Sequence, residues 1–354
     1  MANEIRFGIV GLGMGRGRAN LIPETSGAKL VAVCDIWEER GKLAEKELGC
    51  EWIKDYDQLL KRDDIDVVGI FTPSGTHGQF LIKALQAGKH AFTTKPMDIR
   101  VKVCDEAIEL AEKKGLVLAV DFGLRYEPDN HRIKAALQQG AIGKLIAAEM
   151  SMKWFRAQSY YDGGKPAGWR SRLETEGGSL ANQAVHFLDL LLFWLGPVKT
   201  IYGKKGTFAH RIETEDTSAG VVEFQSGTLG TIFSTTCSFP GQGTSITLTG
   251  STGSLVWHDG KVSLFERMKQ PAAAEGEKPG YVLPENAPAP EPEQLNLVEF
   301  PSPKDLPKNI IEDMVAAITS GQPVQCDGKT GRESVALFCG LYLSSDTSQP
   351  VTLP

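Results

Sequence analysis

A glycine-rich turn near the start of the sequence is suited to holding the phosphates of a dinucleotide. It follows an apolar run at 5–10 and precedes a helical pattern, which is the context that such a turn requires. Glycine lets backbone N–H groups approach a pyrophosphate, and the N-terminus of a helix favours an anion. Arg16 stands where the usual spacing has its third glycine, so we expect a turn that is one residue longer. The residues expected to contact the cofactor are Gly11, Gly13, Met14, Gly15, Arg16 and Gly17.

Asp35 indicates which dinucleotide binds. It comes directly after the apolar run 30–34, where a carboxylate would bond the ribose hydroxyls of the adenosine and repel a 2′-phosphate. The sequence therefore predicts NAD as the cofactor.

Two polar segments follow later apolar runs. They are TPSGTH at 72–77 and TTKP at 93–96, and both lie beyond the carboxyl ends of predicted parallel strands, where open α/β sheets bind ligands. Lys95 could bond a reacting hydroxyl as an ammonium or accept its proton as an amine, because burial and the positive ring of NAD⁺ both lower the pKa of a lysine. The expected cofactor contacts are Thr72, Pro73, Ser74, His77, Thr94 and Lys95.

A polar pair on a predicted helix could complete the site. Asn182 and His186 are four residues apart in the helical pattern 179–195, so both lie on one face of that helix, and Asp189 lies close to it. These side chains can face one pocket. The alternative is that His186 is a hydrogen-bonded histidine of an amphipathic helix. That structural interpretation is favoured for His90, His131, His210 and His258.

The elements that must position these residues alternate in the first part of the chain. Short apolar runs alternate with helical patterns, and three of the helical patterns end at a glycine. Buried strands followed by crossover helices make a parallel sheet, so we expect a doubly wound Rossmann domain over residues 1–121. The expected strands are 5–10, 30–34, 67–71, 90–93 and 116–120, and the expected helices are 37–48, 76–87 and 101–114.

The remainder, residues 122–354, is expected to be an α+β domain for substrate binding and oligomerisation. Its β-runs are joined by short turns that contain glycine, which predicts a large, mainly antiparallel open sheet. The expected strands are 144–153, 198–203, 218–225, 228–236, 245–249, 254–258 and 261–265, and the expected helices are 128–139, 179–195, 309–319 and 331–345. The proline-rich segment 269–303 is either an exposed excursion or an arm over the site or a neighbouring subunit.

Together these motifs resemble those of the Gfo/Idh/MocA family of sugar and cyclitol oxidoreductases, over roughly residues 4–345. In that family a TPxxxH turn flanks the nicotinamide, and a Glu-Lys-Pro motif supplies a lysine that cofactor and substrate share. The resemblance therefore implies that Lys95 and His186 are catalytic. The further matching motifs are GAIGK at 140–144, GGS at 177–179, NQAVHFLD at 182–189 and EDT at 215–217.

Two residues depart from the family pattern. Thr94 stands where the family usually has Glu, and Asn182 stands where many members have Asp. A carboxylate near a lysine stabilises the ammonium, so its loss at both positions should ease the deprotonation of Lys95.

An aromatic and basic stretch, 152–172, suits a carbohydrate. Aromatic faces suit the C–H faces of a sugar ring, and guanidinium groups suit carboxylate, sulfonate or phosphate. The stretch is therefore either an anionic sugar site or a loop at a subunit contact or beside the cofactor. Arg125 and Tyr126 lie where relatives contact substrate, or else they brace the domain junction. The expected substrate contacts are Lys95, Arg125, Tyr126, Trp154, Arg156, Trp169, Arg170, Asn182 and His186.

The resemblance implies an NAD(H)-dependent oxidoreductase that interconverts a secondary alcohol and a ketone on a sugar, sugar acid or cyclitol. One alternative is an oxidoreductive glycosidase, in which transient oxidation permits elimination and addition of water. Another is a non-catalytic NAD and sugar sensor, which the presence of both Lys95 and His186 disfavours.

Composition limits the partners of this chain of 354 residues. Its 38 basic and 44 acidic residues give a net charge of −6, which argues against binding nucleic acid. We expect no signal peptide, no membrane span, no metal site and a cytoplasmic location, since six cysteines are scattered without close pairs. A homodimer or homotetramer is expected, because alternating residues of the open sheet would give it a second apolar face. The residues expected to populate the two faces are Val222, Phe224, Ile232 and Ser234.

Overall fold

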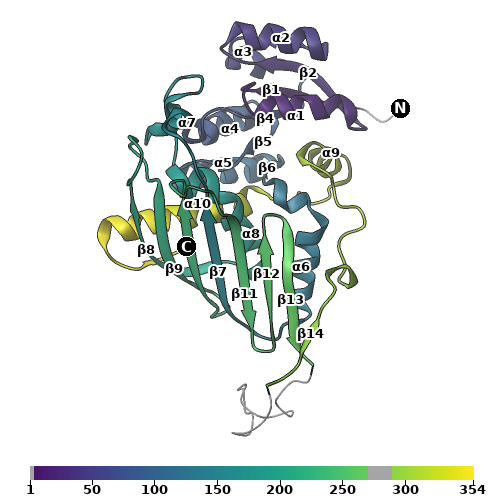
Figure 1. The fold of residues 1–354 in the computed structure, drawn as a ribbon. Helices are drawn as coiled ribbons and strands as arrows, with labels where there is room; N and C mark the ends of the chain where they lie inside the picture. The colour runs from purple at the N-terminus through teal and green to yellow at the C-terminus, as the bar shows by residue number, and fades with distance from the viewer. Residues whose placement is uncertain (1–3, 270–288) are drawn as a thin grey trace.

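The computed structural model describes residues 4–269 and 289–354 (Figure 1). A six-stranded sheet lies at the top of the view and a nine-stranded sheet lies below it. Of the proline-rich segment, residues 270–288 lie outside the described part, and Pro292–Gln294 forms the edge strand β14. In the described ranges, no helix is long and apolar enough to cross a bilayer.

The first sheet is parallel throughout and has the strand order β3-β2-β1-β4-β5-β6. This is the order of a Rossmann fold, so the expected doubly wound domain is confirmed. The short edge strand β3 and helix α3 were not expected. The strands are β1 (Ile5–Val10), β2 (Ala28–Cys34), β3 (Glu51–Ile53), β4 (Val67–Ile70), β5 (His90–Thr94) and β6 (Leu118–Asp121). The helices are α1 (Gly15–Leu21), α2 (Glu38–Leu48), α3 (Tyr56–Leu60), α4 (His77–Gln86) and α5 (Val101–Lys114).

Helix ends in this sheet follow the sequence signals. Gly49 ends α2 and Gly115 ends α5, and both adopt φ of 64°, the left-handed conformation that only glycine enters without strain. The chain therefore turns back to the sheet at these two points.

The second sheet is antiparallel except for one central pair. Its order is β14-β13-β12-β11-β7-β10-β9-β8-β15, and β7 and β10 run parallel. The expected mainly antiparallel open sheet is confirmed. Its strands are β7 (Leu145–Lys153), β8 (Val198–Gly206), β9 (Thr217–Phe224), β10 (Leu229–Thr235), β11 (Gly243–Gly250), β12 (Gly253–His258), β13 (Lys261–Met268), β14 and β15 (Val351–Thr352).

Helices α6 (Pro128–Gln138), α8 (Val185–Leu195) and α10 (Gly328–Thr347) cover one face of this sheet. The expectation that four named residues populate two faces is wrong. All four are buried on the covered face, because residues two apart in a strand point to the same side. These residues are Val222, Phe224, Ile232 and Ser234. The other face instead exposes Tyr202, Val221 and Leu229.

Helix α9 (Ile310–Ser320) packs against the first sheet, although it comes from the second part of the chain (Figure 1). Ile310, Ile311 and Met314 share a buried cluster with Phe7 and Val33. The chain thus crosses between the two sheets more than once, and a domain boundary after residue 121 stays a prediction.

Candidate functional site

A cavity of about 960 Å³ lies where the carboxyl ends of β1, β4 and β5 meet the start of α8 and the loop after β7. In the first sheet the strand order switches sides between β1 and β4, because β2 and β3 follow on one side of β1 and β4 to β6 follow on the other. Doubly wound sheets bind ligands at such a switch point. Both parts of the chain line this cavity. A ligand within it would contact both.

The glycine turn begins the cavity wall. Gly11 has φ of 85°, and a Cβ there would lie 2.5 Å from the carbonyl oxygen of Phe71, so only glycine fits. Helix α1 already begins at Gly15, whose Cα packs against the Phe71 ring, so the turn is shorter than expected. Gly11, Gly13 and Met14 line the cavity, whereas Gly15, Arg16 and Gly17 do not.

Arg16 and Gly17 lie on helix α1, outside the turn. The Arg16 guanidinium forms an ion pair with Glu47, and Gly17 is exposed with open space around it. Gly15, and not Gly17, gives the close packing between helix and strand that the third glycine of such a turn provides.

Asp35 holds the glycine turn in place and faces the cavity. Its Oδ2 accepts a hydrogen bond of 2.7 Å from the Leu12 N–H, and its Oδ1 accepts one of 2.8 Å from the Trp37 N–H. The carboxylate is buried at the end of β2, where a ribose would be bound in a dinucleotide site.

His77 joins the turn after β4 to the turn after β5. Its ring nitrogens lie 2.7 Å from the Pro96 carbonyl oxygen and 2.6 Å from the Thr72 carbonyl oxygen. Burial lowers the pKa of His77. His77 thus fixes the two turns that carry the neighbouring polar residues. The residues of these two turns and of the start of α4 that line the cavity are Thr72, Pro73, Ser74, Thr76, His77, Thr94 and Lys95.

Lys95 and His186 face the same cavity from opposite parts of the chain. The Lys95 ammonium donates a hydrogen bond to the backbone carbonyl oxygen of Asn182. Burial lowers the pKa of Lys95 to about 8. Burial and the nearby Lys95 charge lower the pKa of His186 well below its usual value. At neutral pH the pair therefore consists of a mainly cationic lysine and a neutral imidazole.

The helix that carries Asn182 and His186 differs from the expected single α-helix. Residues Ser179–Ala184 form a π-helical turn, η5, and the α-helix starts only at Val185. Gly178, with φ of 85°, redirects the chain just before this turn. Both Asn182 and His186 still line the cavity, so the structure brings them together with Lys95.

The loop after β7 supplies a basic and aromatic wall. The Arg156 guanidinium lies 5.0 Å from the Trp154 ring and 5.3 Å from the Tyr160 ring, and it donates a hydrogen bond to Gln183 Oε1. The Arg170 guanidinium lies 4.6 Å from the Tyr160 ring. Cationic groups stacked on aromatic faces keep their outer N–H groups free for a ligand. The residues of this wall that line the cavity are Arg156, Tyr160, Lys165, Trp169 and Arg170.

Three expected substrate residues do not line the cavity. Trp154 packs edge-on against Phe187 and supports Arg156 from behind. Arg125 is buried in an ion pair with Asp189, and the Tyr126 hydroxyl donates to Asp313. For Arg125 and Tyr126 the structure thus favours the alternative interpretation, that they brace the junction.

Lys165 connects the two ends of the cavity wall. Its ammonium lies 5.4 Å from the Trp37 ring and 3.6 Å from Glu39 Oε2, both in the segment after β2. The loop after β7 therefore reaches the Asp35 end of the cavity as well as the Lys95 end.

Other lining residues were not found in the sequence. Asp121 is buried at the end of β6 and accepts a 2.6 Å hydrogen bond from Arg18 of α1. A polar residue at the carboxyl end of a parallel strand was the signal that could have indicated Asp121. Tyr160 belongs to the aromatic and basic stretch 152–172 that the sequence indicates for a carbohydrate, and the structure brings it to the cavity. Gln183, in the turn η5, carried no comparable signal.

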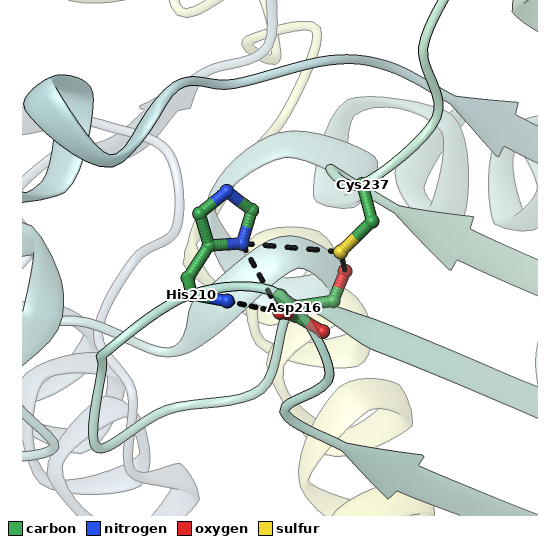
Figure 2. Close-up of side chains that lie close together, drawn as sticks. All are labelled: His210, Asp216 and Cys237. Atoms are coloured by element: carbon green, nitrogen blue, oxygen red, sulfur yellow. Dashed lines mark hydrogen bonds and ion pairs between the residues drawn. The ribbon is translucent and has the colours of Figure 1, made fainter.

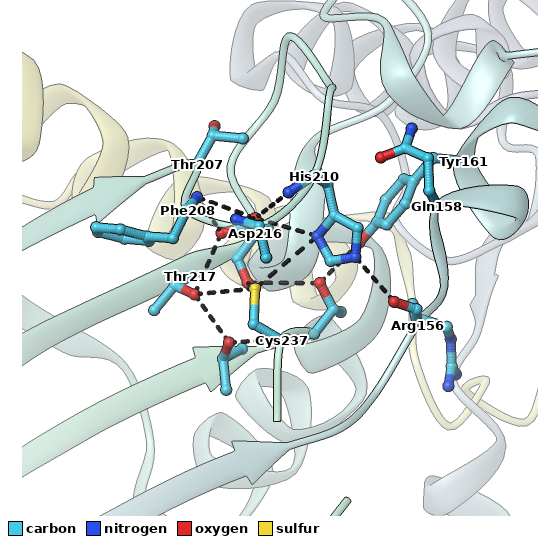
Figure 3. Close-up of polar contacts among 12 residues, drawn as sticks. Arg156, Gln158, Tyr161, Thr207, Phe208, His210, Asp216, Thr217 and Cys237 are labelled. Atoms are coloured by element: carbon cyan, nitrogen blue, oxygen red, sulfur yellow. Dashed lines mark hydrogen bonds and ion pairs between the residues drawn. The ribbon is translucent and has the colours of Figure 1, made fainter. Parts of the chain in front are cut away.

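A cluster behind the wall, consisting of His210, Asp216 and Cys237, brings three possible metal ligands within 4.8 Å of one another (Figure 2). Figure 3 shows that their polar atoms already have protein partners. Asp216 Oδ2 accepts bonds from His210 Nδ1 and from the backbone N–H groups of Ala209 and His210, at 2.9–3.1 Å. His210 Nε2 lies 2.8 Å from the carbonyl oxygen of Arg156. The cluster is thus built as an anchor for Arg156, in line with the structural interpretation of His210.

Comparison with known proteins supports one family. Residues 5–122 match the family model described as "Oxidoreductase family, NAD-binding Rossmann fold", and residues 130–256 match the GFO/IDH/MocA C-terminal domain. The scyllo-inositol 2-dehydrogenase (NAD⁺) of Bacillus subtilis is 29% identical over 72% of this chain and 74% of its own length. The myo-inositol 2-dehydrogenase of Thermotoga maritima is 25% identical over 70% of this chain and 74% of its own.

A solved structure resembles the whole chain. The WlbA dehydrogenase of Bordetella pertussis, in complex with NADH and UDP-GlcNAcA, superposes with a TM-score of 0.84 at 26% identity, over 99% of each chain. The similarity therefore extends over both sheets.

Proposed function

The chain belongs to the Gfo/Idh/MocA family and is an NAD-binding oxidoreductase of the sugar and cyclitol dehydrogenase type; on this premise we propose that it interconverts a secondary alcohol and a ketone on a sugar that carries an anionic group. One observation carries the proposal: Lys95 and His186 open onto the same cavity as the glycine turn and Asp35. A reacting carbon could thus lie between a cofactor and a proton acceptor.

The residues present fit NAD. The turn at Gly11 and Gly13 leaves room for a pyrophosphate, and no side chain of the turn fills that room. Asp35 would hold the ribose hydroxyls, and Thr72, Pro73 and Thr94 would line the nicotinamide end. Bound NAD⁺ supplies the acceptor for a hydride from the substrate carbon.

His186 takes the hydroxyl proton in this proposal. Its pKa is lowered by burial, so the imidazole is neutral and can accept that proton as the C–H hydride leaves. Within the described part of the chain its ring has no hydrogen-bond partner, which leaves its nitrogens available to a substrate. In the reverse direction His186 returns the proton to the oxygen of the ketone.

Lys95 orients the oxygen that reacts. As an ammonium it donates hydrogen bonds to that oxygen and stabilises negative charge that develops there. Its remaining contact with the Asn182 carbonyl fixes where the ammonium lies.

The basic wall supports an anionic substrate. Arg156, Lys165 and Arg170 line the cavity within a chain whose net charge is −6, and Trp169 offers an aromatic face beside them. Guanidinium groups bind carboxylate or phosphate in a bidentate manner, and aromatic faces stack on sugar C–H groups. A sugar acid or a phosphate-linked sugar combines both features.

The test is a screen of sugars, uronates, sugar phosphates, cyclitols and glycosides with NAD⁺, in which absorbance at 340 nm and product mass are followed together. Sustained NADH formation that is fastest with anionic sugars is the expected result. Aglycone release without net NADH would identify an oxidoreductive glycosidase, and binding without turnover would identify a sensor.

A homo-oligomer formed through the open face of the second sheet is also proposed. Tyr202, Val221 and Leu229 each expose about half of the residue's surface there, at 44%, 55% and 58%. An apolar sheet face of this kind is usually covered.

A further inference from the structure

Glu176 is a buried carboxylate close to the proposed catalytic lysine. It is 1% exposed and comes just before the glycine pair that leads into η5. Its Oε1 accepts a 3.0 Å hydrogen bond from the Gly177 N–H, and its Oε2 accepts hydrogen bonds from Ser74 Oγ, at 3.3 Å, and from Asn182 Nδ2. Every one of these partners is a donor. These hydrogen bonds favour the ionised carboxylate, against the effect of burial, which raises the pKa of Glu176.

Asn182 connects this carboxylate to Lys95. Its side-chain amide donates to Glu176, while its backbone carbonyl accepts from the Lys95 ammonium. The negative charge of Glu176 raises the pKa of Lys95 and so opposes the larger effect of burial. Lys95 in turn favours ionisation of Glu176, whose pKa burial raises.

The sequence pattern had indicated that Lys95 lacks a carboxylate partner. Thr94 and Asn182 occupy the two positions where the resembled family has Glu or Asp. Glu176 comes from a different segment, and Ser74 and Asn182 hold it at the same end of the cavity. A carboxylate is therefore present near Lys95 after all.

We propose that Glu176 is a positioning residue that acts through Asn182 to keep Lys95 in its ammonium form, in place of the carboxylates absent at positions 94 and 182. The expected effect of Glu176 on turnover rests on the proposed function. Its effect on the charge of Lys95 can be measured without any substrate.

The other groups around Lys95 do not supply this charge. Arg156, from the loop after β7, is positive and lowers the pKa of Lys95. His186 on α8 and His77 on α4 have pKa values that burial lowers, and a histidine carries no negative charge in either protonation state. Tyr160 has a raised pKa and stays a neutral phenol. Asp121, which also lines the cavity, is paired with Arg18.

The first experiment measures the pKa of Lys95 in the protein without substrate. Trace labelling with acetic anhydride over a pH series, read by mass spectrometry, reports the unprotonated fraction of each lysine. Glu176→Gln keeps the shape of the side chain and removes its charge, so the pKa of Lys95 should fall by about one unit or more. An unchanged pKa would overturn the proposal.

A double variant in which the two side chains are exchanged, called the swapped pair, controls for a folding defect in Glu176→Gln. In Glu176→Gln/Asn182→Asp the amide and carboxylate exchange places, which retains both the hydrogen bond and the net charge. The pKa of Lys95 should return towards the wild-type value. A pKa that stays low in the double variant would show that Glu176 does not act through its charge.

Glu215→Gln is the matched control. Glu215 is a second buried acidic side chain beside η5, and burial raises its pKa to about 8. It accepts hydrogen bonds from the Leu180 N–H and the Tyr342 hydroxyl without lining the cavity. This substitution should leave the pKa of Lys95 unchanged. An equal shift in Glu176→Gln and Glu215→Gln would contradict the proposal.

The pH profile of kcat/KM then tests the catalytic consequence. In Glu176→Gln the limb of kcat/KM that belongs to Lys95 should move to lower pH by the same amount as the labelling curve. In the swapped pair the limb should return towards its wild-type position. If the labelling curve moves and the kinetic limb does not, Glu176 controls Lys95 as proposed but Lys95 is not part of the proposed reaction.

Discussion

Arg125 and Asp189 form a buried ion pair in which two hydrogen bonds of 2.8 Å join the guanidinium to the carboxylate. Asp189 lies three residues beyond His186 on α8, and Arg125 also donates to the Gln325 carbonyl, so the pair fixes this helix to the segment before α10. The pair therefore positions one wall of the cavity without entering it.

Arg125→Leu should destabilise the fold because it leaves the Asp189 charge buried without a partner. Loss of one member of a buried pair costs about 3–5 kcal/mol in the free energy of unfolding. Urea unfolding measures this cost. Arg125→Leu/Asp189→Leu should recover part of it. A variant of normal stability with a raised KM would instead support the substrate role expected from the sequence.

Replacement of the proposed catalytic pair should lower turnover. His186→Ala should reduce kcat by about 10²–10⁴-fold with little change in NAD affinity, because the loss falls on the transition state. Lys95→Ala should reduce kcat and also weaken ligand binding, and Lys95→Arg should not restore kcat, since the planar guanidinium is bulkier than the compact ammonium and does not place its charge at the same point. The measurements are kcat and NAD binding by calorimetry.

The pH dependence of kcat/KM separates the two roles. A limb near pH 8 that is lost in Lys95→Ala belongs to Lys95, whose pKa is about 8. If kcat/KM falls as the pH rises through this limb, Lys95 acts as the ammonium, as proposed. If kcat/KM instead rises through it in the wild type and in His186→Ala, but not in Lys95→Ala, Lys95 is the base. Near wild-type activity in both variants would remove this pair from the mechanism.

Asp35→Ser should weaken NAD binding and reduce the difference in affinity between NAD⁺ and NADP⁺. The wild-type carboxylate repels a 2′-phosphate and also orders the glycine turn through the Leu12 N–H. Calorimetry with both cofactors checks this. If the wild type binds NADP⁺ more tightly, the assignment is wrong, and Arg40, which lines the same end of the cavity, becomes the candidate phosphate contact.

Asp216→Asn should reduce stability at neutral pH and raise the KM for substrate, since Asp216 anchors the His210 side chain that contacts the Arg156 carbonyl. Burial raises the pKa of Asp216. The backbone N–H groups of Ala209 and Phe208 and the side chain of His210 donate hydrogen bonds to the carboxylate, and their combined effect exceeds that of burial and lowers the pKa below its usual value. The stabilisation is therefore present above the unfolded pKa of about 4 and is lost as the pH falls through the lower folded value. Thermal unfolding from pH 2 to 7 should show a larger acid loss of stability in the wild type than in the variant, because Asp64 and Asp66, whose pKa values are also lowered, titrate in both proteins.

Val221→Glu should dissociate a homo-oligomer that forms through the open sheet face. A charge within an apolar interface is costly to bury. Leu343→Glu, at an exposed position of α10 that lies outside this face, is the control. Light scattering at micromolar concentration measures the mass. A monomeric wild type would contradict the proposed oligomer.

Local patterns in the sequence were sufficient for the fold and for part of the site. Five strands of the first sheet, the strands β7 to β13 of the second sheet and the ends of α2 and α5 follow from apolar runs and from Gly49 and Gly115, whereas the short edge strands β14 and β15 were not expected. The three-residue strand β3 was missed because it is too short to show a period. The π-helical turn was missed because the same apolar pattern fits an α-helix.

Partners far apart in the sequence set the remaining features of the site. Nothing near Arg125 in the sequence indicates that Asp189 neutralises it. Similarly, Glu176 lies 81 residues after Lys95 in the sequence and is connected to it by Asn182, so residues adjacent to Lys95 could not predict the charge of the lysine. Only the packing of the two sheets' connecting segments brings these groups together.

The contact of Lys165 with Trp37 and Glu39 has a kinetic consequence. It joins the loop after β7 to the segment beside Asp35, so an opening of the cavity between these segments breaks an ion pair that is exposed to solvent. Dissolved salt screens such pairs. The residence time of a dinucleotide should thus shorten as ionic strength rises, and product release could become faster in a saline buffer even where the chemical step is unchanged.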